Sequence, residues 1–204
     1  MEQHGRQDAR AAGADALIGA ARRLTRWGLW FGGVLVLLAA VVIGVDVALR
    51  KFFALSIGGA DELAGYALAL GTAWSLGAAL LERAHIRIDS LYAFFPRSLR
   101  LALDFVGIAL LVAFFGLVAW YGWAVVEQSW VSSSRSQSAL STPIVLPQSI
   151  WLIGLALFCL VGLALLVHAV LLIAGGDAAG AARAISTRSA SEEVEDELRE
   201  MKEH

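Results

Sequence analysis

Residues 27–45 read WGLWFGGVLVLLAAVVIGV and contain no charged side chain. An α-helix rises about 1.5 Å per residue, so about 20 apolar residues are needed to cross the hydrocarbon core of a bilayer, which is about 30 Å thick. This stretch meets the requirement, and residues 46–49 extend it. A soluble amphipathic helix of this length would carry a polar face, which the stretch lacks. It therefore predicts a membrane-spanning helix.

Three further segments pass the same test: residues 63–81, 105–126 and 148–167, the last continuing past His168 to Ala174. Of the 204 residues, 58% are apolar and only 17% are charged, below the roughly 25% of an ordinary soluble domain. Because a helix satisfies its own backbone hydrogen bonds in lipid, the sequence predicts an all-α membrane protein with four transmembrane helices. The net charge of −2 argues against nucleic-acid binding, and the single cysteine, Cys159, excludes an internal disulfide.

The positive charges divide unevenly between the two sides of the predicted bundle. Thirteen Lys and Arg residues fall in the N-terminal segment, the second loop and the C-terminal tail, against three in the first and third loops. Because Lys- and Arg-rich loops stay in the cytoplasm, both termini are expected inside. We therefore divide the chain into a basic cytoplasmic segment (1–26), a four-helix transmembrane domain (27–174) and an acidic cytoplasmic tail (175–204).

The connection between the second and third spans has a helical pattern of its own. Asp89 is placed to cap such a helix, and Pro96 would disturb its end. The pattern predicts a short amphipathic helix lying in the inner membrane interface, with a plain extension of the neighbouring helix as the alternative. The apolar residues that recur at helical spacing are Ile88, Leu91, Tyr92, Phe95 and Leu99.

The third connection, residues 127–149, is the longest segment expected on the outer side. It is rich in serine and contains Pro143 and Pro147, residue types that favour extended or turning backbone. It is therefore interpreted either as a flexible hairpin or as a contact surface for a periplasmic partner.

Ionisable residues near the spans are few, and each is costly to bury in lipid. Asp46 and Arg50 are four residues apart near the outer end of the first span, so we expect them to form an ion pair. A single carboxylate there makes a poor sodium site, because hard cations take about six oxygen ligands. Glu62 stands at the start of the second span. No catalytic constellation is present, so an enzyme is not expected.

Two histidines raise the alternative of a haem protein. His168 lies within the fourth apolar segment and His85 follows the second, and histidines on neighbouring helices can hold a b-type haem. However, His85 lies outside its apolar segment and no second matched pair exists. We therefore expect no cofactor and no metal ion.

Small residues recur at four-residue spacing on two of the predicted helices. In lipid, such stripes let helix backbones approach closely and drive association. We expect them to be divided between packing within the chain and contact with a partner. The stripes are Gly28 and Gly32 on the first helix, and Gly71, Ser75 and Ala79 on the second.

The stretches around the first two spans carry a more specific signal. Residues 45–53 read VDVALRKFF, residues 61–63 read DEL, and residues 77–91 read GAALLERAHIRIDSL, followed by Phe95 and Pro96. Over residues 27–100 the chain resembles the small integral-membrane subunit of tripartite ATP-independent periplasmic (TRAP) transporters. That family often has asparagine where this chain has Asp46.

The resemblance implies a role in transport. Such subunits pair one-to-one with a large membrane subunit that holds the substrate and sodium sites. A soluble periplasmic protein delivers organic acids, and the ion gradient rather than ATP drives uptake across the bacterial inner membrane. The small subunit acts there as a static scaffold, and Asp46, Arg50, Glu62, His85, Arg87 and Asp89 are expected to serve assembly. The alternative is a stand-alone four-helix membrane protein, such as a b-haem protein or a membrane enzyme.

Overall fold

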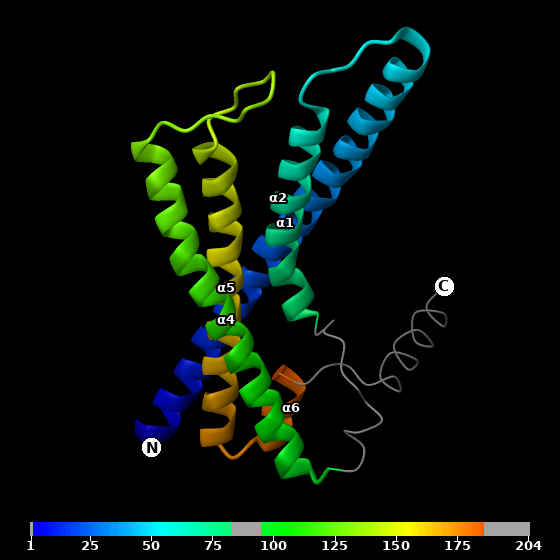
Figure 1. Cartoon of the computed structure of the whole chain (residues 1–204). Coiled ribbons are helices and arrows are strands. Elements are labelled where there is room, and N and C mark those ends of the chain that lie inside the picture. Colours follow the sequence, from blue (N-terminus) through cyan, green and yellow to red (C-terminus); the bar gives the residue numbers. More distant parts are fainter. Residues whose placement is uncertain (1, 83–94, 186–204) are drawn as a thin grey trace, which may run out of the picture.

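The structure is a computed structural model that describes residues 2–82 and 95–185 and, for residues 2–18, 97 and 183, the backbone alone. The described residues contain no strand, only one isolated bridge between Arg135 and Pro143. The predicted all-α fold is therefore confirmed. The helices are α1 (Glu2–Phe53), α2 (Ala60–Leu81), α4 (Arg97–Val131), α5 (Val145–Ala174) and α6 (Ala178–Ile185) (Figure 1).

Four helices contain a segment long and apolar enough to cross a membrane: Gly19–Phe53, Ala60–Leu81, Ser98–Val131 and Val145–Ala174. They coincide with the four predicted spans, and each is longer than the apolar stretch that predicted it. α1 runs without a break from Glu2, so most of the segment expected as a separate basic N-terminus is continuous with the first span. The reason is composition, because Ala, Arg, Leu and Gln in this segment are good helix formers.

The helix ends follow local sequence. Gly59, with a φ of 102°, takes up the left-handed conformation that favours glycine directly before α2. Pro96 is extended and precedes α4, which agrees with its missing N–H and fixed φ. Asp177 Oδ1 accepts a 2.7 Å hydrogen bond from the N–H of Gly180 and so caps the N-terminus of α6.

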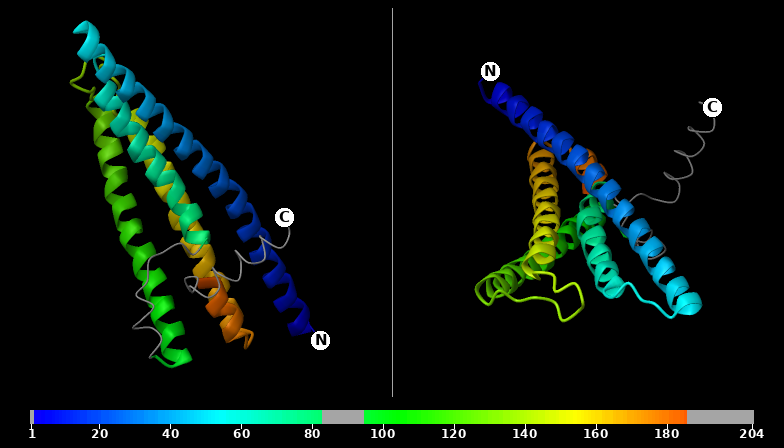
Figure 2. Two further views of the ribbon diagram at one scale, coloured as in Figure 1. Left: turned by 90° about the vertical axis from the view of Figure 1, so that its right-hand side faces the viewer. Right: turned by 90° about the horizontal axis from the view of Figure 1, so that it is seen from above.

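α2 and α5 lie in the middle of the bundle, with α1 packed on α2 and α4 packed on α5 (Figure 2). In the most apolar 18-residue stretch of each helix, the buried share is 44% for α2 and 33% for α5, but only 17% for α1 and 11% for α4. Phe158 of α5 is fully buried, and its ring packs edge-on against that of Phe115, with centroids 4.8 Å apart. α1 and α4 therefore present most of their surface to the surroundings.

α6 lies within the segment expected as an acidic cytoplasmic tail (175–204), yet it packs on the bundle. Ala181 is completely buried and Ile185 joins the core around α5. The predicted interfacial helix and the acidic part of the tail lie mainly in residues 83–94 and 186–204, outside the described residues. Leu99, counted as part of that helix, belongs to α4.

The two ends of the bundle differ in what they carry. The first turns of α1 and α6 lie at one end, while the α1–α2 turn (residues 54–59) and the α4–α5 loop (residues 132–144) lie at the other (Figure 1). We call these the arginine end, after Arg22, Arg23 and Arg26, and the loop end.

Candidate functional site

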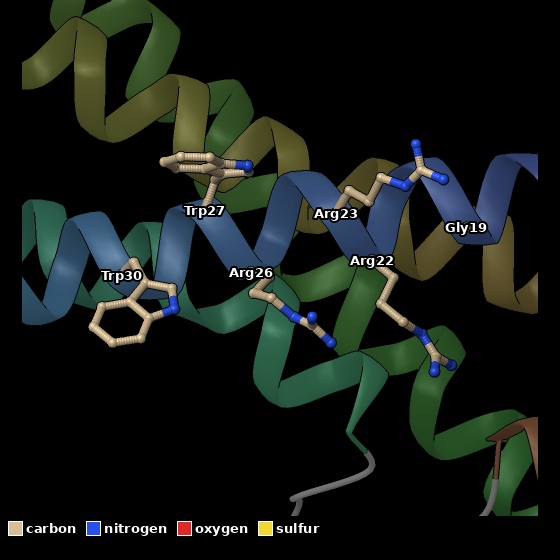
Figure 3. A pocket seen from close by; sticks show the side chains of 6 residues that line it. All are labelled: Gly19, Arg22, Arg23, Arg26, Trp27 and Trp30. Carbon is tan, nitrogen blue, oxygen red and sulfur yellow. The ribbon is translucent and has the colours of Figure 1, made fainter.

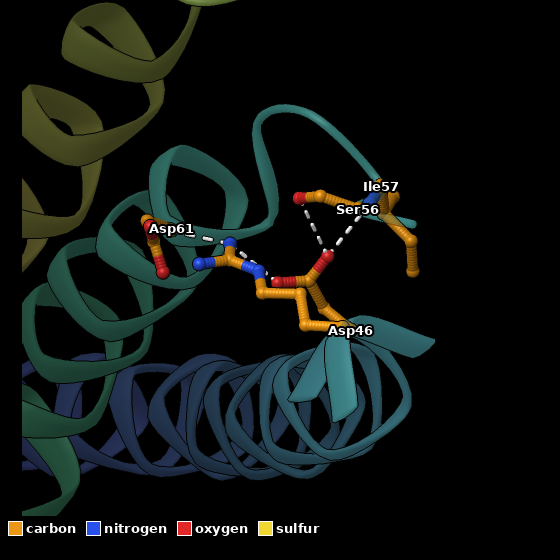
Figure 4. A network of polar contacts seen from close by, with 5 residues as sticks. Asp46, Ser56, Ile57 and Asp61 are labelled. Carbon is orange, nitrogen blue, oxygen red and sulfur yellow. Dashed lines mark hydrogen bonds and ion pairs between the residues drawn. The ribbon is translucent and has the colours of Figure 1, made fainter. Parts of the chain in front are cut away.

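Asp46 is at the centre of a polar cluster at the loop end (Figure 4). It is only 2% exposed. Its Oδ1 accepts a 2.6 Å hydrogen bond from the N–H of Ile57 and a 3.0 Å bond from the hydroxyl of Ser56. Its Oδ2 lies 2.5 Å from a guanidinium nitrogen of Arg50, so the expected ion pair is present. The same guanidinium lies 3.9 Å from the carboxylate of Asp61.

This arrangement fixes the turn between α1 and α2. The carboxylate of Asp46 is buried, but two hydrogen bonds and one ion pair compensate its charge. Ala54, just after α1, has a φ of 52°, which is unusual for a residue with a Cβ and needs such support. A cation at Asp46 would have to displace Arg50, so the chemistry of the cluster is that of a structural clamp.

Glu62 forms a second cluster, which joins the two helical hairpins. Its Oε2 accepts a hydrogen bond from the hydroxyl of Ser138 in the α4–α5 loop. The same hydroxyl accepts a 3.1 Å hydrogen bond from the N–H of Leu140. Within the loop, the N–H of Ser136 donates to the carbonyl of Thr142 over 2.9 Å. The loop is therefore a hydrogen-bonded hairpin that is tied to the first turn of α2.

Apolar contacts reinforce this tie. A Cβ built on Gly59 would lie 2.7 Å from Leu140 Cδ1, and one on Gly58 would lie 3.1 Å from Ala139 Cβ. The α4–α5 loop thus lies directly against the α1–α2 turn, and the loop end forms one continuous surface.

The first small-residue stripe packs within the chain. A Cβ on Gly28 would lie 2.6 Å from the carbonyl oxygen of Trp74, and one on Gly32 would lie 2.7 Å from that of Gly71. Real Cβ atoms essentially never approach so closely, and the opposing atoms are backbone, which cannot rotate away. Gly28 and Gly32 therefore set the separation between α1 and α2.

Trp74, which no sequence pattern singled out, connects three helices. Its Nε1–H donates a 3.0 Å hydrogen bond to the carbonyl of Ile150 on α5, and its ring lies 5.4 Å from that of Phe31 on α1. A Cβ on Gly154 would lie 2.7 Å from Trp74 Cδ1. The sequence feature that could have indicated this role is the position of Trp74 inside an apolar span, away from both ends of that span.

Other tight contacts fall on glycines outside the predicted stripes. A Cβ on Gly77 would lie 2.7 Å from Thr25 Cγ2, and one on Gly162 would collide with Val112. Ser75 and Ala79, the rest of the second stripe, are only half-buried. The hydroxyl of Ser75 donates to the carbonyl of Thr72 on its own helix, 3.1 Å away.

Of the remaining predicted residues, the structure describes only His168. His85, Arg87 and Asp89 lie outside the described residues, and His168 is half-buried on α5. In the part of the chain that the structure describes, no three His, Cys, Asp or Glu side chains are placed to hold a metal ion. What this site can do chemically is join helices, loops and neighbouring surfaces.

One family model matches the chain, over residues 39–172, about two thirds of its length. Its description is the DctQ component of tripartite ATP-independent periplasmic transporters. The match covers α2, α4 and most of α5, together with the C-terminal part of α1. No curated protein and no solved structure matches the chain.

Proposed function

Because the chain belongs to the DctQ family, the small permease component of TRAP transporters, we propose that it is the scaffold subunit of an ion-gradient-driven uptake system for organic acids. The observation that carries this proposal is the family match, which extends from the last part of α1 through α2 and α4 to near the end of α5. The family is one of transporter components, so the chain is a multi-pass membrane protein of a transport system rather than an enzyme.

The distribution of charge supports a scaffold rather than a transport path. Asp46, Arg50 and Glu62 lie near the loop end and are engaged in the clamps described above. Within α5, His168 is the only residue with an ionisable nitrogen or oxygen. A carboxylate substrate crossing the bilayer needs polar partners along its way, because an unpaired charge in hydrocarbon is costly. The large subunit is therefore the component that holds substrate and sodium.

The proposed arrangement places the arginine end in the cytoplasm and the loop end in the periplasm of a bacterium. The excess of Lys and Arg at the arginine end supports it. The residues proposed to anchor the inner side are His85, Arg87 and Asp89, in an interfacial helix before α4. Reporter fusions at His204 and within residues 132–138 test this topology, and a periplasmic C-terminus would contradict it.

At the loop end we propose transient contact with a periplasmic substrate-binding protein. Support comes from the hydrogen bonds that hold the α4–α5 loop against the α1–α2 turn, because a preformed surface loses little entropy on binding. The exposed apolar faces of α1 and α4 are the surfaces available to the large subunit and to lipid.

Reconstitution tests the function. The chain, the large subunit and the binding protein are combined in liposomes with an inward sodium gradient, and uptake of labelled dicarboxylates and sialic acid is measured. We expect uptake only when all three components are present, and none when the gradient is removed. Full uptake by the large subunit and binding protein alone would contradict a scaffold role, and a Soret band on the purified chain would support the haem alternative instead.

A further inference from the structure

An open groove of about 590 Å³ follows one face of α1 at the arginine end (Figure 3). Arg23 and Trp27 stand along one edge, and Arg22 and Arg26 along the other. Gly19 also lines the groove and has no side chain, and no described heavy atom lies within 4 Å of the place where its Cβ would be. The described side chains leave this groove open, with the guanidinium of Arg23 along one edge and those of Arg22 and Arg26 along the other.

These three charges have no counter-ion in the described part of the chain. No ion pair joins Arg22, Arg23 or Arg26 to a described carboxylate. Glu82 lines a neighbouring groove together with Arg22 and Arg26, yet it pairs with neither. A cluster of unpaired guanidinium groups attracts an anion, and the planar donors of arginine suit the oxygens of a phosphate.

The surroundings of the groove are those of the membrane surface. Trp27 and Trp30 are 76% and 70% exposed, and exposed tryptophans at the end of a span sit at headgroup level. Farther along the same helix face, toward the loop end, Val34, Leu37 and Val41 are all exposed. The basic groove thus continues directly into an apolar strip.

From this juxtaposition we propose that the groove binds one anionic phospholipid. Its phosphate lies among Arg22, Arg23 and Arg26, and an acyl chain follows the strip of Val34, Leu37 and Val41. Free phosphate would use the arginines but not the apolar strip. A protein partner would have to bring several carboxylates to the membrane surface. The groove precedes residue 39, where the family match begins, so it is a feature of this chain beyond the matched region.

Native mass spectrometry of the purified full chain tests the site. The chain in detergent is titrated with phosphatidylglycerol or with phosphatidylcholine carrying the same acyl chains. Because basic side chains near the membrane surface attract anionic headgroups, three arginines acting on one headgroup should favour phosphatidylglycerol over phosphatidylcholine by roughly tenfold or more. Replacing all three, R22Q/R23Q/R26Q, should remove this preference.

Two variants serve as controls. R22K/R23K/R26K keeps the charge but loses the bidentate donors, and it should retain only part of the preference. R135Q removes a positive charge at the opposite end and should leave the preference unchanged. The thermal unfolding temperature of each variant shows whether it is folded.

Four results would overturn the proposal. The first is an unchanged preference in R22Q/R23Q/R26Q, and the second is an equal loss in R135Q. The third is loss of bound phosphatidylglycerol when the large subunit joins the chain, because the groove would then be a protein contact. Displacement of the lipid by inorganic phosphate at equal concentration would likewise show that the apolar strip plays no part.

Discussion

Replacing Gly32 with alanine tests whether close backbone contact sets the separation of α1 and α2. The new Cβ would lie 2.7 Å from the Gly71 carbonyl oxygen and 3.0 Å from the Gly71 Cα. Ordinary contact begins at 3.4 Å, so the helices must part locally by about 0.7 Å. Overpacking of this kind costs about 1–3 kcal/mol, and the better helix propensity of alanine returns about 1 kcal/mol.

We therefore expect G32A to lower the free energy of unfolding by up to about 2 kcal/mol. Tryptophan fluorescence during thermal unfolding in mild detergent measures this, since Trp74 lies in the same interface. Gly33 supplies the matched control, because it is adjacent on α1 and nothing lies within 4 Å of its Cβ position. G33A should be neutral or stabilising. Equal unfolding temperatures for G32A and G33A would refute the reasoning.

Three further changes test the clamps and the last helix. D46N should lose the ion pair but keep an acceptor for the N–H of Ile57, whereas D46A leaves that N–H unbonded at a cost of about 1–3 kcal/mol. D46N should therefore destabilise the chain less than D46A. Equal unfolding temperatures for the two variants would contradict the clamp. S138A should remove the hydrogen bond to Glu62, which is worth about 1.5–3 kcal/mol because the acceptor is charged. The α4–α5 loop should then be cleaved faster by a protease. An unchanged cleavage rate would show that the loop is held in another way. D177A should remove the cap of α6 at a cost of about 1 kcal/mol, which hydrogen exchange of the α6 amides would detect as faster exchange; an unaltered rate would argue against the cap.

The sequence was most informative where one short-range rule was enough. Length and apolarity located the four spans, because a bilayer imposes both on any helix that crosses it. The spacing of Asp46 and Arg50 predicted their ion pair, since residues four apart share a helix face. The same spacing rule found Gly28 and Gly32, although it could not tell that they would meet Trp74 and Gly71.

Features that depend on tertiary placement were missed. The hydrogen bond from the N–H of Ile57 to Asp46 depends on the course of a turn, which no local pattern specifies. Gly77, Gly154 and Gly162 pack tightly, but they do not form a stripe at four-residue spacing with the glycines that were recognised. The helix around Ala181 was missed because its Ala- and Gly-rich sequence resembles that of a solvated tail.

A cross-link between the two hairpins tests the central claim, that the chain is a static scaffold, most directly. A Cβ at Gly58 would lie 3.1 Å from that of Ala139, close to the roughly 3.5–4.5 Å of a disulfide. G58C/A139C, in a chain that also carries C159A, therefore allows the loop end to be locked by oxidation and released by reduction. In the reconstituted system we expect the same uptake rate in the oxidised and reduced states. Uptake that stops on oxidation and returns on reduction would show that the chain moves during transport and is not a scaffold.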